Sequence, residues 1–323
     1  MKIDFIKCHG SGNDFILIDE LKESLNISEN DRINLAIELC NREKSIGADG
    51  ILFVQSSSFC DGKMRIFNAD GSEPEMCGNG LRCVGRYLID ALGKDFITVE
   101  TMKAKYDVKA VSEIFNGVRT VEIEIDTVSF DVTTLPLNHS KSTLINEALL
   151  ALSEDLVFTA VSITNPHIVT FIEDLSRNEI TRIGKEANTN KTVFPQGVNV
   201  NFVKIIDNNS IYVTTYERGV GITKSCGTGM TASSAAYCLN NPGQYYKELN
   251  IYNDGGMIKI YVNKDELNNY KIRFIGNGSY VYCSTVEVDD NFKVTSLSDK
   301  KDFEDEISSY NEFLKYTKEV ISK

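Results

Sequence analysis

The sequence predicts an α/β (or α+β) protein made of two similar halves. Two observations lead to this prediction. Segments that alternate apolar and polar residues recur between glycine-rich turns, as strands do. The pattern Cys-Gly-x-Gly, followed by a plausible helix, occurs at Cys77 and again at Cys226, nearly half the chain length apart. A duplicated unit explains the repeat, and a pseudo-twofold arrangement of the halves would make the two cysteines face each other.

Length and composition limit the class of protein. The chain has 323 residues, enough for a large core and two domains, and its formal net charge is −12. Such acidity disfavours nucleic acid and anionic membranes as partners, because both require a basic patch. The N-terminus "MKIDFIKCHG" lacks the apolar core of a signal peptide, and no apolar run is long enough to span a bilayer. We expect a cytoplasmic protein that acts on or binds a small molecule.

The first half begins with a strand, a glycine turn at "HGSGND" and a second strand. Residues 29–42 space their apolar positions like an amphipathic helix. "GADGILFV" and "KMRIFNADG" are typical of strands closed by turns, and a helix is expected in "LRCVGRYLIDAL" after Cys77. Residues 96–126 alternate in the manner of strands. The first half is therefore expected to place its one cysteine-led helix among strands.

The second half is expected to start with a helix at 142–153. "AVSITNPHIVTFIED" predicts two strands around an Asn-Pro turn, and "GVNVNFVKIIDNNSIYVTTYERG" and "LNIYNDGGMIKIYVN" predict hairpins. After these, residues 291–323 form an extra tail that we expect to be helical. Its apolar stripe consists of Phe303, Ile307, Tyr310, Leu314 and Ile321. The stripe predicts packing on the body of the protein, with a homodimer contact as the alternative.

Eight cysteines lie in the chain, and no Cys-x-x-Cys pair occurs. This spacing weakens zinc and thioredoxin-like interpretations, and we predict no metal site. An intracellular chain of this size needs no disulfides, so most of its cysteines are expected to be small buried apolar residues. That expectation covers Cys8, Cys40, Cys60, Cys83, Cys238 and Cys283.

Cys77 and Cys226 differ because each stands before glycines at a helix start. The positive end of the helix dipole is expected to lower such a thiol pKa from about 8.5 toward neutrality. Free N–H groups beside the glycines suit a carboxylate. Two such units, opposed, would hold one carboxylate with a sulfur on each side of the adjacent carbon. One thiolate could then remove an α-proton while the other thiol returns one to the opposite face, which inverts an amino acid without any cofactor.

Three motifs carry a resemblance to a known family: "HGSGNDFILID", "NADGSEPEMCGNGLRC" and "YERGVGITKSCGTG", with "TNPH" and "GVNVNF" between the last two. Over residues 1–288 the chain resembles the diaminopimelate epimerase family, which are pyridoxal-independent two-cysteine enzymes. The resemblance implies two pseudo-symmetric domains, each a mixed sheet curled around a central helix, with the active site in the cleft between them. It places the N-terminal domain at 1–122 plus 275–323 and the C-terminal domain at 123–274.

The resemblance also implies the roles of individual residues. Cys77 and Cys226 match the catalytic acid/base pair, and His167 and Glu217 match groups that orient the reacting end of the substrate and support the thiols. The implied substrate-binding positions are Asn13, Asn68, Gly78, Asn79, Asn165, Asn199, Glu217, Arg218, Gly227 and Thr228. The chemistry agrees, because an arginine can hold a carboxylate bidentately and an asparagine amide can both donate and accept.

The implied activity is the interconversion of LL- and meso-diaminopimelate, in lysine and peptidoglycan-precursor synthesis. A racemase of another amino acid, such as histidine, is the alternative on the same fold. A thiol redox sensor that pairs Cys77 with Cys226, and a non-catalytic binding protein, are alternatives of other classes. Two positions depart from the family pattern: Ile222 stands where a glutamate is common, and Gly50 where some members carry glutamine. At Ile222 we expect local repacking.

Overall fold

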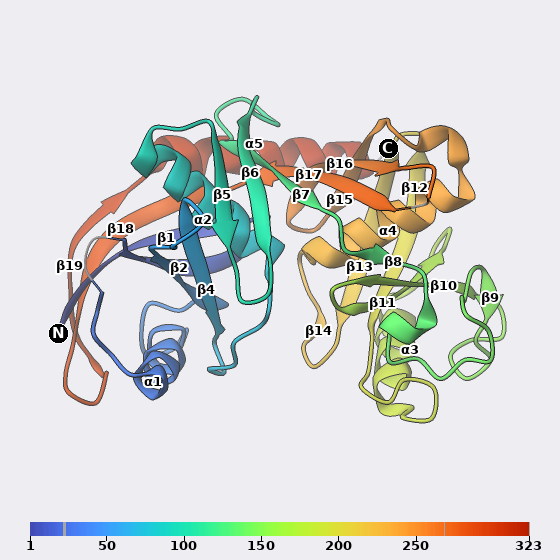
Figure 1. Ribbon diagram of the computed structural model, residues 1–323, viewed down its shortest axis with the longest axis horizontal. Coiled ribbons are helices and arrows are strands. Elements are labelled where there is room, and N and C mark those ends of the chain that lie inside the picture. The colour runs from blue at the N-terminus through green and yellow to red at the C-terminus, as the bar shows by residue number, and fades with distance from the viewer. Residues whose placement is uncertain (22–23, 268, 323) are drawn as a thin grey trace. The chain divides into compact units, whose positions relative to one another are not determined.

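The computed structural model describes residues 1–21, 24–267 and 269–322. It divides into two compact units (Figure 1). Unit 1 comprises Met1–Ile123 and Ile275–Tyr316, and unit 2 comprises Glu124–Phe274 and Thr317–Lys323. The chain leaves unit 1 within β7 (Thr120–Ile125) and returns within β17 (Tyr270–Asn277). In the described part of the chain, no helix is both long enough and apolar enough to cross a membrane.

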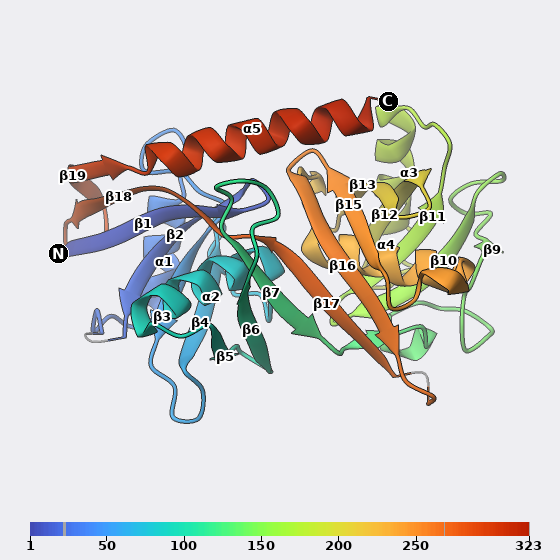
Figure 2. The ribbon, with the colours of Figure 1, turned by 90° about the horizontal axis from the view of Figure 1, so that it is seen from above.

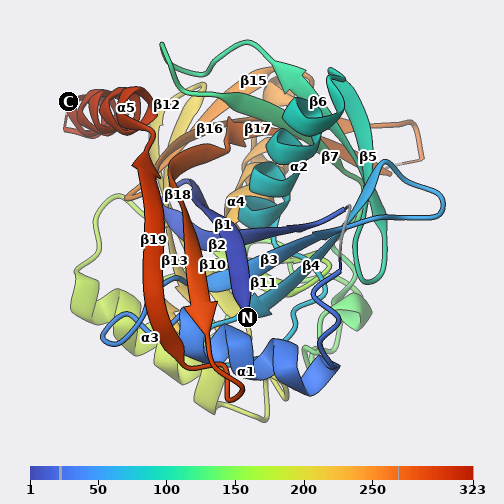
Figure 3. The same ribbon diagram turned by 90° about the vertical axis from the view of Figure 1, so that its left-hand side faces the viewer.

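Unit 1 is a mixed sheet that surrounds helix α2 (Gly78–Leu92), as Figure 3 shows. Its strands are β1 (Lys2–Gly10), β2 (Asn13–Glu20), β3 (Gly50–Gln55), β4 (Gly62–Asn68), β5 (Phe96–Glu100), β6 (Lys105–Val111), β18 (Ser279–Val288) and β19 (Val294–Asp302). From β1 to β6 the pairings are antiparallel, parallel, antiparallel, parallel and antiparallel. Helix α1 (Glu29–Leu39) makes the first parallel crossover, and α2 makes the second.

Unit 2 repeats this plan around helix α4 (Gly227–Asn240). Its main strands are β10 (Val157–Ile163), β11 (Pro166–Phe171), β12 (Asn199–Asp207), β13 (Ser210–Glu217), β15 (Glu248–Asn253) and β16 (Gly256–Lys264). The pairings from β10 to β16 follow the same order of antiparallel and parallel neighbours. Helix α3 (Arg177–Thr189) makes the first parallel crossover and α4 the second. The predicted fold class, a mixed α/β fold with a repeated half, is confirmed.

Short elements complete unit 2. They are β8 (Val128–Ser129), β9 (Glu147–Ala148), β14 (Gly221–Ile222), and two turns of 3₁₀ helix, η1 (Val132–Thr134) and η2 (Pro242–Gln244). The core of this unit gathers apolar residues of β10, β11 and β12 with the inner face of α3. Helix α4 is buried on nearly all sides, and its small residues suit this place. Ser233 and Ser234 donate back to carbonyls four residues earlier, so their hydroxyls are satisfied inside the core.

Two predictions of secondary structure are wrong. Residues 142–153 form turns and β9 instead of a helix, because Asn146 adopts a left-handed backbone with φ 51° that a helix cannot contain. The Asn146 side chain donates to Asn240, which fixes the turn. The tail is not helical throughout, since β19 pairs with β18 before α5 (Glu304–Ile321) begins (Figure 2). The helix α3 had no counterpart among the predicted elements.

Helix α5 is tied to unit 1 by a buried ion pair and by ring contacts. Arg86 of α2 donates twice to Glu306, at 2.6 Å for each bond, and Glu306 also accepts from the Tyr280 backbone N–H. One turn further along α5, the Tyr310 ring lies 4.3 Å from the His9 ring, measured between centroids. Phe313 is fully buried against Phe115. The tail thus contributes to the core around α2.

Replacing Glu306 with alanine should lower the free energy of unfolding by about 3 kcal/mol, because buried Arg86 would lose both hydrogen bonds to Glu306 and keep only the more distant Asp90 carboxylate, 3.5 Å from its Nε. Urea denaturation followed by circular dichroism measures this change. The double variant Arg86→Met, Glu306→Leu should lose clearly less than the single variant. Equal losses in the two variants would show that the ion pair does not hold α5.

Candidate functional site

Cys77 is the N-cap of α2. Its backbone is extended, with φ −141° and ψ 109°, and the cap side chain makes no hydrogen bond to the helix. The N–H groups of the first turn therefore lack a side-chain cap and lie beside a half-buried thiol. Gly78 and Asn79 supply the first two of these groups, as the sequence predicts for an anion site.

The Asn13 amide lies against Cys77. Its Oδ1 accepts a 3.1 Å bond from Asn79 and lies 3.9 Å from Cys77 Sγ, which donates to it. Its Nδ2 donates to Asp49 at 2.6 Å. Arg42 in turn binds Asp49 at 2.7 Å. Because a carboxylate only accepts, Asp49 turns the amide so that the Asn13 carbonyl faces the thiol.

Charged side chains cluster around Asp14, the residue that follows Asn13. Asp14 is bound by Lys7 and Arg42, at 2.6 Å each. Burial by itself would raise the Asp14 pKa, but Arg42 and Lys7 together hold that pKa well below its usual range. Asp14 thus stays ionised and helps keep Arg42 in place beside Asp49. The sequence motifs do not single out Asp14, Arg42 or Asp49 as a cluster, because acidic and basic side chains are typical of any surface.

Asn68 ends β4 and belongs to the turn that precedes α2. Its Nδ2 donates to Ser72 Oγ at 2.9 Å, and its backbone N–H donates to Ser72 O. Here the side chain holds the turn in "NADGS" together, so its predicted role in substrate binding stays a prediction.

Cys226 occupies the equivalent position at the start of α4. It is the N-cap, with φ −118° and ψ 108°, and it is 7% exposed. Gly227 and Thr228 supply the first helical N–H groups, and Thr228 Oγ1 lies 3.6 Å from Cys226 Sγ. Gly229 allows the helix start to sit this deep. A Cβ at Gly229 would lie 2.4 Å from Asn201 Oδ1 and 2.6 Å from Thr215 Oγ1.

His167 does not contact the thiol directly. Its Nε2 lies 2.9 Å from Asn165 Oδ1, and Asn165 Nδ2 donates to Thr228 Oγ1 at 3.2 Å. His167 is fully buried, and burial, aided by the charge of Arg218, lowers its pKa to about 3. The imidazole is therefore neutral near pH 7, and hydrogen bonds connect it to Thr228 through Asn165.

Glu217 ends β13 and is half-buried. It accepts a 2.5 Å bond from Thr223, the residue after strand β14, which pairs antiparallel with β13. Its charge acts on Cys226. Burial, followed by the Glu217 carboxylate, raises the Cys226 pKa well above its usual value, although Thr228 and the Gly229 N–H oppose the shift.

The predicted lowering of the thiol pKa is thus wrong for Cys226. The helix end stabilises a thiolate by a fraction of a charge, whereas burial removes almost all of the water that would solvate it. A neighbouring carboxylate adds to that penalty. At rest this cysteine is a thiol.

Asn199 and Arg218 lie at one end of the hairpin of β12 and β13. Asn199 Oδ1 accepts the Arg218 backbone N–H at 2.8 Å, and the Arg218 side chain is exposed and donates to Gln196 O at 3.1 Å. Asn199 therefore shapes the turn that presents Arg218, and the guanidinium has other donors for an anion.

The arrangement was compared with known proteins. A family model described as diaminopimelate epimerase matches residues 5–127 and 159–280. The diaminopimelate epimerase of Clostridium acetobutylicum is 53% identical over 318 residues, which cover 98% of this chain and 96% of that protein. The Listeria monocytogenes serovar 1/2a enzyme of the same name is 40% identical over 325 residues, covering 99% and 98%.

The chain belongs to the diaminopimelate epimerase family. The predicted family resemblance is thereby confirmed. Solved structures with the same fold include a Bacillus anthracis PhzF-family protein, with TM-score 0.65 and 17% identity, covering 89% of this chain and all of that one. A probable proline racemase from Agrobacterium radiobacter has TM-score 0.58 and 14% identity, covering 89% and 93%. At these identities the likeness concerns the fold alone.

Ile222, the departure from the family pattern, packs with Tyr216 against the core of unit 2. The next residue, Thr223, supplies the hydroxyl that Glu217 accepts. Glu217 therefore keeps a polar partner next to Ile222, and the local repacking stays a prediction.

The six other cysteines divide by burial. Cys8, Cys40, Cys83 and Cys238 are buried, as predicted, and burial raises the pKa of Cys40 and Cys238 to about 12. Cys60 and Cys283 are only half-buried, so the prediction is wrong for these two. Within the described ranges, no three His, Cys, Asp or Glu side chains are placed to hold a metal ion.

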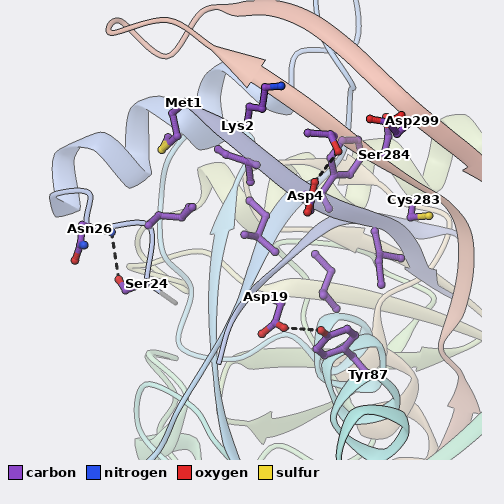
Figure 4. A pocket seen from close by; sticks show the side chains of 17 residues that line it. Met1, Lys2, Asp4, Asp19, Ser24, Asn26, Tyr87, Cys283, Ser284 and Asp299 are labelled. Atoms are coloured by element: carbon purple, nitrogen blue, oxygen red, sulfur yellow. Dashed lines mark hydrogen bonds between the residues drawn. The ribbon is translucent and has the colours of Figure 1, made fainter. Parts of the chain in front are cut away.

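A cavity of about 830 Å³ lies in unit 1, away from the predicted site residues (Figure 4). Asp4, Asp19 and Asp299 contribute carboxylates to its lining. Asp19 accepts from Tyr87 at 2.8 Å, and Asp4 accepts from Thr285 at 2.6 Å. Asp4 and Asp19 are therefore hydrogen-bonded to other residues that line the cavity. None of the residues predicted to act in catalysis or binding lines it.

The position of Glu217 predicts how Cys226 reacts with an alkylating reagent. Because the carboxylate raises the thiol pKa, Glu217→Gln should shift the pH profile of Cys226 alkylation toward lower pH. Iodoacetamide labelling followed by peptide mass spectrometry measures each cysteine separately. Glu248→Gln, which removes a carboxylate paired with Lys259 in the same unit, is the control and should leave the profile in place. An unchanged profile in Glu217→Gln would contradict this electrostatic assignment.

Proposed function

We propose that the protein is a cofactor-independent epimerase that interconverts LL- and meso-diaminopimelate. The observation that carries the proposal is the repeat: each unit contains a central helix whose N-cap is a cysteine and whose first turn lacks a side-chain cap. Membership of the diaminopimelate epimerase family, with relatives of that name matched over nearly the whole chain, supports this substrate. We further propose that the two half-sites act on one substrate molecule.

The reaction requires one proton to leave the α-carbon and another to arrive on the opposite face. As Cys77 thiolate takes the α-proton, the electron pair of the C–H bond moves into the substrate carboxylate, which becomes enolate-like. The Cys226 thiol then donates its proton to the other face of the same carbon. Cys77 ends as the thiol and Cys226 as the thiolate, and the reverse reaction exchanges these roles.

The acidity of the α-carbon is the main obstacle, since its pKa exceeds that of a thiol by roughly ten units, at about 1.4 kcal/mol each. Uncapped N–H groups at the starts of α2 and α4 can stabilise the extra negative charge of the enolate-like carboxylate. Glycines at 78 and 227 leave these N–H groups open to the substrate.

The surroundings of each thiol fit the two roles. The raised Cys226 pKa keeps its proton available for donation. Once the proton has left, the Thr228 hydroxyl and the Gly229 N–H can donate to the thiolate. In unit 1 the Asn13 carbonyl can accept from the Cys77 thiol after that group has taken the α-proton.

The remaining predicted residues would hold the substrate. Arg218, exposed at its turn, suits the distal carboxylate, while the side-chain amides can bind both the carboxylates and the ammonium groups. The amides concerned are those of Asn13, Asn68, Asn165 and Asn199. We place the enzyme in the cytoplasm with this small molecule as its partner; a homodimer remains the proposed assembly.

Epimerisation of LL-diaminopimelate, followed by chiral chromatography, tests the proposal. Cys77→Ala and Cys226→Ala should each reduce the rate at least 100-fold, in line with the loss of a general acid or base, which costs roughly 10²–10⁴. Cys60→Ala and Cys283→Ala remove half-buried thiols elsewhere and serve as controls that should retain the parent rate.

Two results would contradict the proposed function. One is Cys77→Ala that still epimerises at the parent rate. The other is a parent protein that racemises L-histidine and leaves both diaminopimelate isomers untouched, which would favour the alternative substrate.

A further inference from the structure

Asn201 is a buried residue of β12 whose amide direction is fixed by the backbone. Its Nδ2 donates to Ile168 O at 3.0 Å, and a carbonyl oxygen can only accept. Its Oδ1 accepts from the Thr215 hydroxyl at 2.9 Å. The Ile168 carbonyl therefore requires that the NH₂ group of the amide face β11, and the Thr215 hydroxyl can donate to the oxygen on the other side.

This orientation determines which nitrogen of His167 carries the proton. The second hydrogen of Asn201 Nδ2 points to His167 Nδ1 at 3.1 Å, so Nδ1 must accept. The proton of the neutral imidazole then lies on Nε2. From there it donates to Asn165 Oδ1, 2.9 Å away.

The donor-to-acceptor direction of these hydrogen bonds continues from Asn165 toward the Cys226 thiol. With its Oδ1 turned toward His167, Asn165 presents Nδ2 to Thr228 Oγ1 at 3.2 Å. The Thr228 oxygen thus receives a hydrogen bond from Asn165, and its own hydrogen can point at Cys226 Sγ, 3.6 Å away. When the Thr228 hydroxyl donates to Cys226 Sγ, the hydrogen bond favours the thiolate form of Cys226 over the thiol.

We propose that Asn201 is a positioning residue for epimerisation, which directs the chain His167–Asn165–Thr228 so that the Thr228 hydroxyl donates to Cys226. The inference rests on the proposed function, because it assigns Asn201 a part in the proton transfers of Cys226. Asn201 itself acts only through its neighbours.

The packing around Asn201 supports a specific requirement for its amide. A Cβ on Gly229 would lie 2.4 Å from Asn201 Oδ1, so the first turn of α4 is fitted to the amide. Asn201 and His167 are both fully buried, and an unsatisfied partner there would cost about 1–3 kcal/mol. The Asn201 NH₂ group serves two buried acceptors, Ile168 O and His167 Nδ1, and both would lose their partner without it.

Asn201→Asp keeps the shape and removes the donor. The introduced carboxyl accepts from His167, which must then protonate Nδ1 and leave Nε2 as an acceptor. Asn165 turns over to donate to Nε2, and its carbonyl takes the hydrogen of the Thr228 hydroxyl. Cys226 then loses its donor.

NMR spectroscopy can determine the tautomer of His167 directly, because the chain has only three histidines whose signals must be told apart. In ¹⁵N-labelled parent protein, His167 should show a protonated Nε2 and an unprotonated Nδ1, with signals assigned by their loss in His167→Gln. Asn201→Asp should exchange the two patterns and lower kcat about tenfold or more, with KM changed less than kcat. Thr170→Val, which removes a buried hydroxyl from neighbouring β11, is the matched control and should keep the parent signals and kcat.

Asn201→Ala provides a second variant should the aspartate fail to fold, as judged by circular dichroism. It also removes the donor, and it should lower kcat with the His167 pattern no longer fixed on Nε2. Parent protein with Nδ1 protonated, or an Asn201→Asp variant with parent signals and parent kcat, would overturn the inference. An inactive parent whose His167 carries its proton on Nε2 would instead overturn the proposed function while leaving the hydrogen-bond direction intact.

Discussion

A thiol at the first turn of a central helix is the constraint on which each half of this protein depends. In unit 1 the cysteine N-cap makes no side-chain cap hydrogen bond to its helix, and in unit 2 the Cys226 sulfur meets only the Thr228 hydroxyl and the Gly229 N–H, so other first-turn N–H groups need another partner. The helix end can be kept this way only if the surrounding sheet holds it in place. Both sheets do so through the same succession of antiparallel and parallel pairs, which wraps six strands around α2 and six around α4.

The two units hold their thiols by different physical means. In unit 1, Arg42 fixes Asp49, which turns the Asn13 carbonyl toward Cys77. In unit 2, neutral groups buried in the sheet orient Asn165 against Thr228, and the charge nearest the thiol is the Glu217 carboxylate. Charged groups at a partly exposed site can be solvated, whereas a buried site needs neutral partners with complete hydrogen bonding.

The sequence predicts much of the fold because local signals agree with it. The strands, the hairpins at "DNN" and "NDGG" and the helices after Cys77 and Cys226 all follow from periodicity and turn residues. The helix expected at 142–153 is absent because Asn146 takes a left-handed backbone, a tertiary choice that apolar spacing does not reveal. β19 is polar and mostly exposed, so its pairing with β18 leaves no alternation to detect.

Sequence motifs point to candidate site residues within them, but they do not point to the residues that support those side chains. Hydrogen bonds through one or more other side chains connect Asp49 and Asn201 to the two cysteines, and the partners are distant in sequence. The "NVN" of β12 did contain a signal, since two asparagines two positions apart share one face of a strand and are both buried. The Cys226 pKa could not be predicted either, because the helix end is visible in the sequence but the depth of burial is not.

The most direct test of the two-thiol mechanism is the position of deuterium early in the reaction. LL-diaminopimelate is incubated with the protein in D₂O, and product and remaining substrate are separated at low conversion and analysed by mass spectrometry. Two thiols on opposite faces predict one deuterium at the inverted carbon of the meso product and none in the remaining LL substrate. Deuterium entering the remaining substrate as fast as the product, or a product that keeps its original proton, would contradict the mechanism.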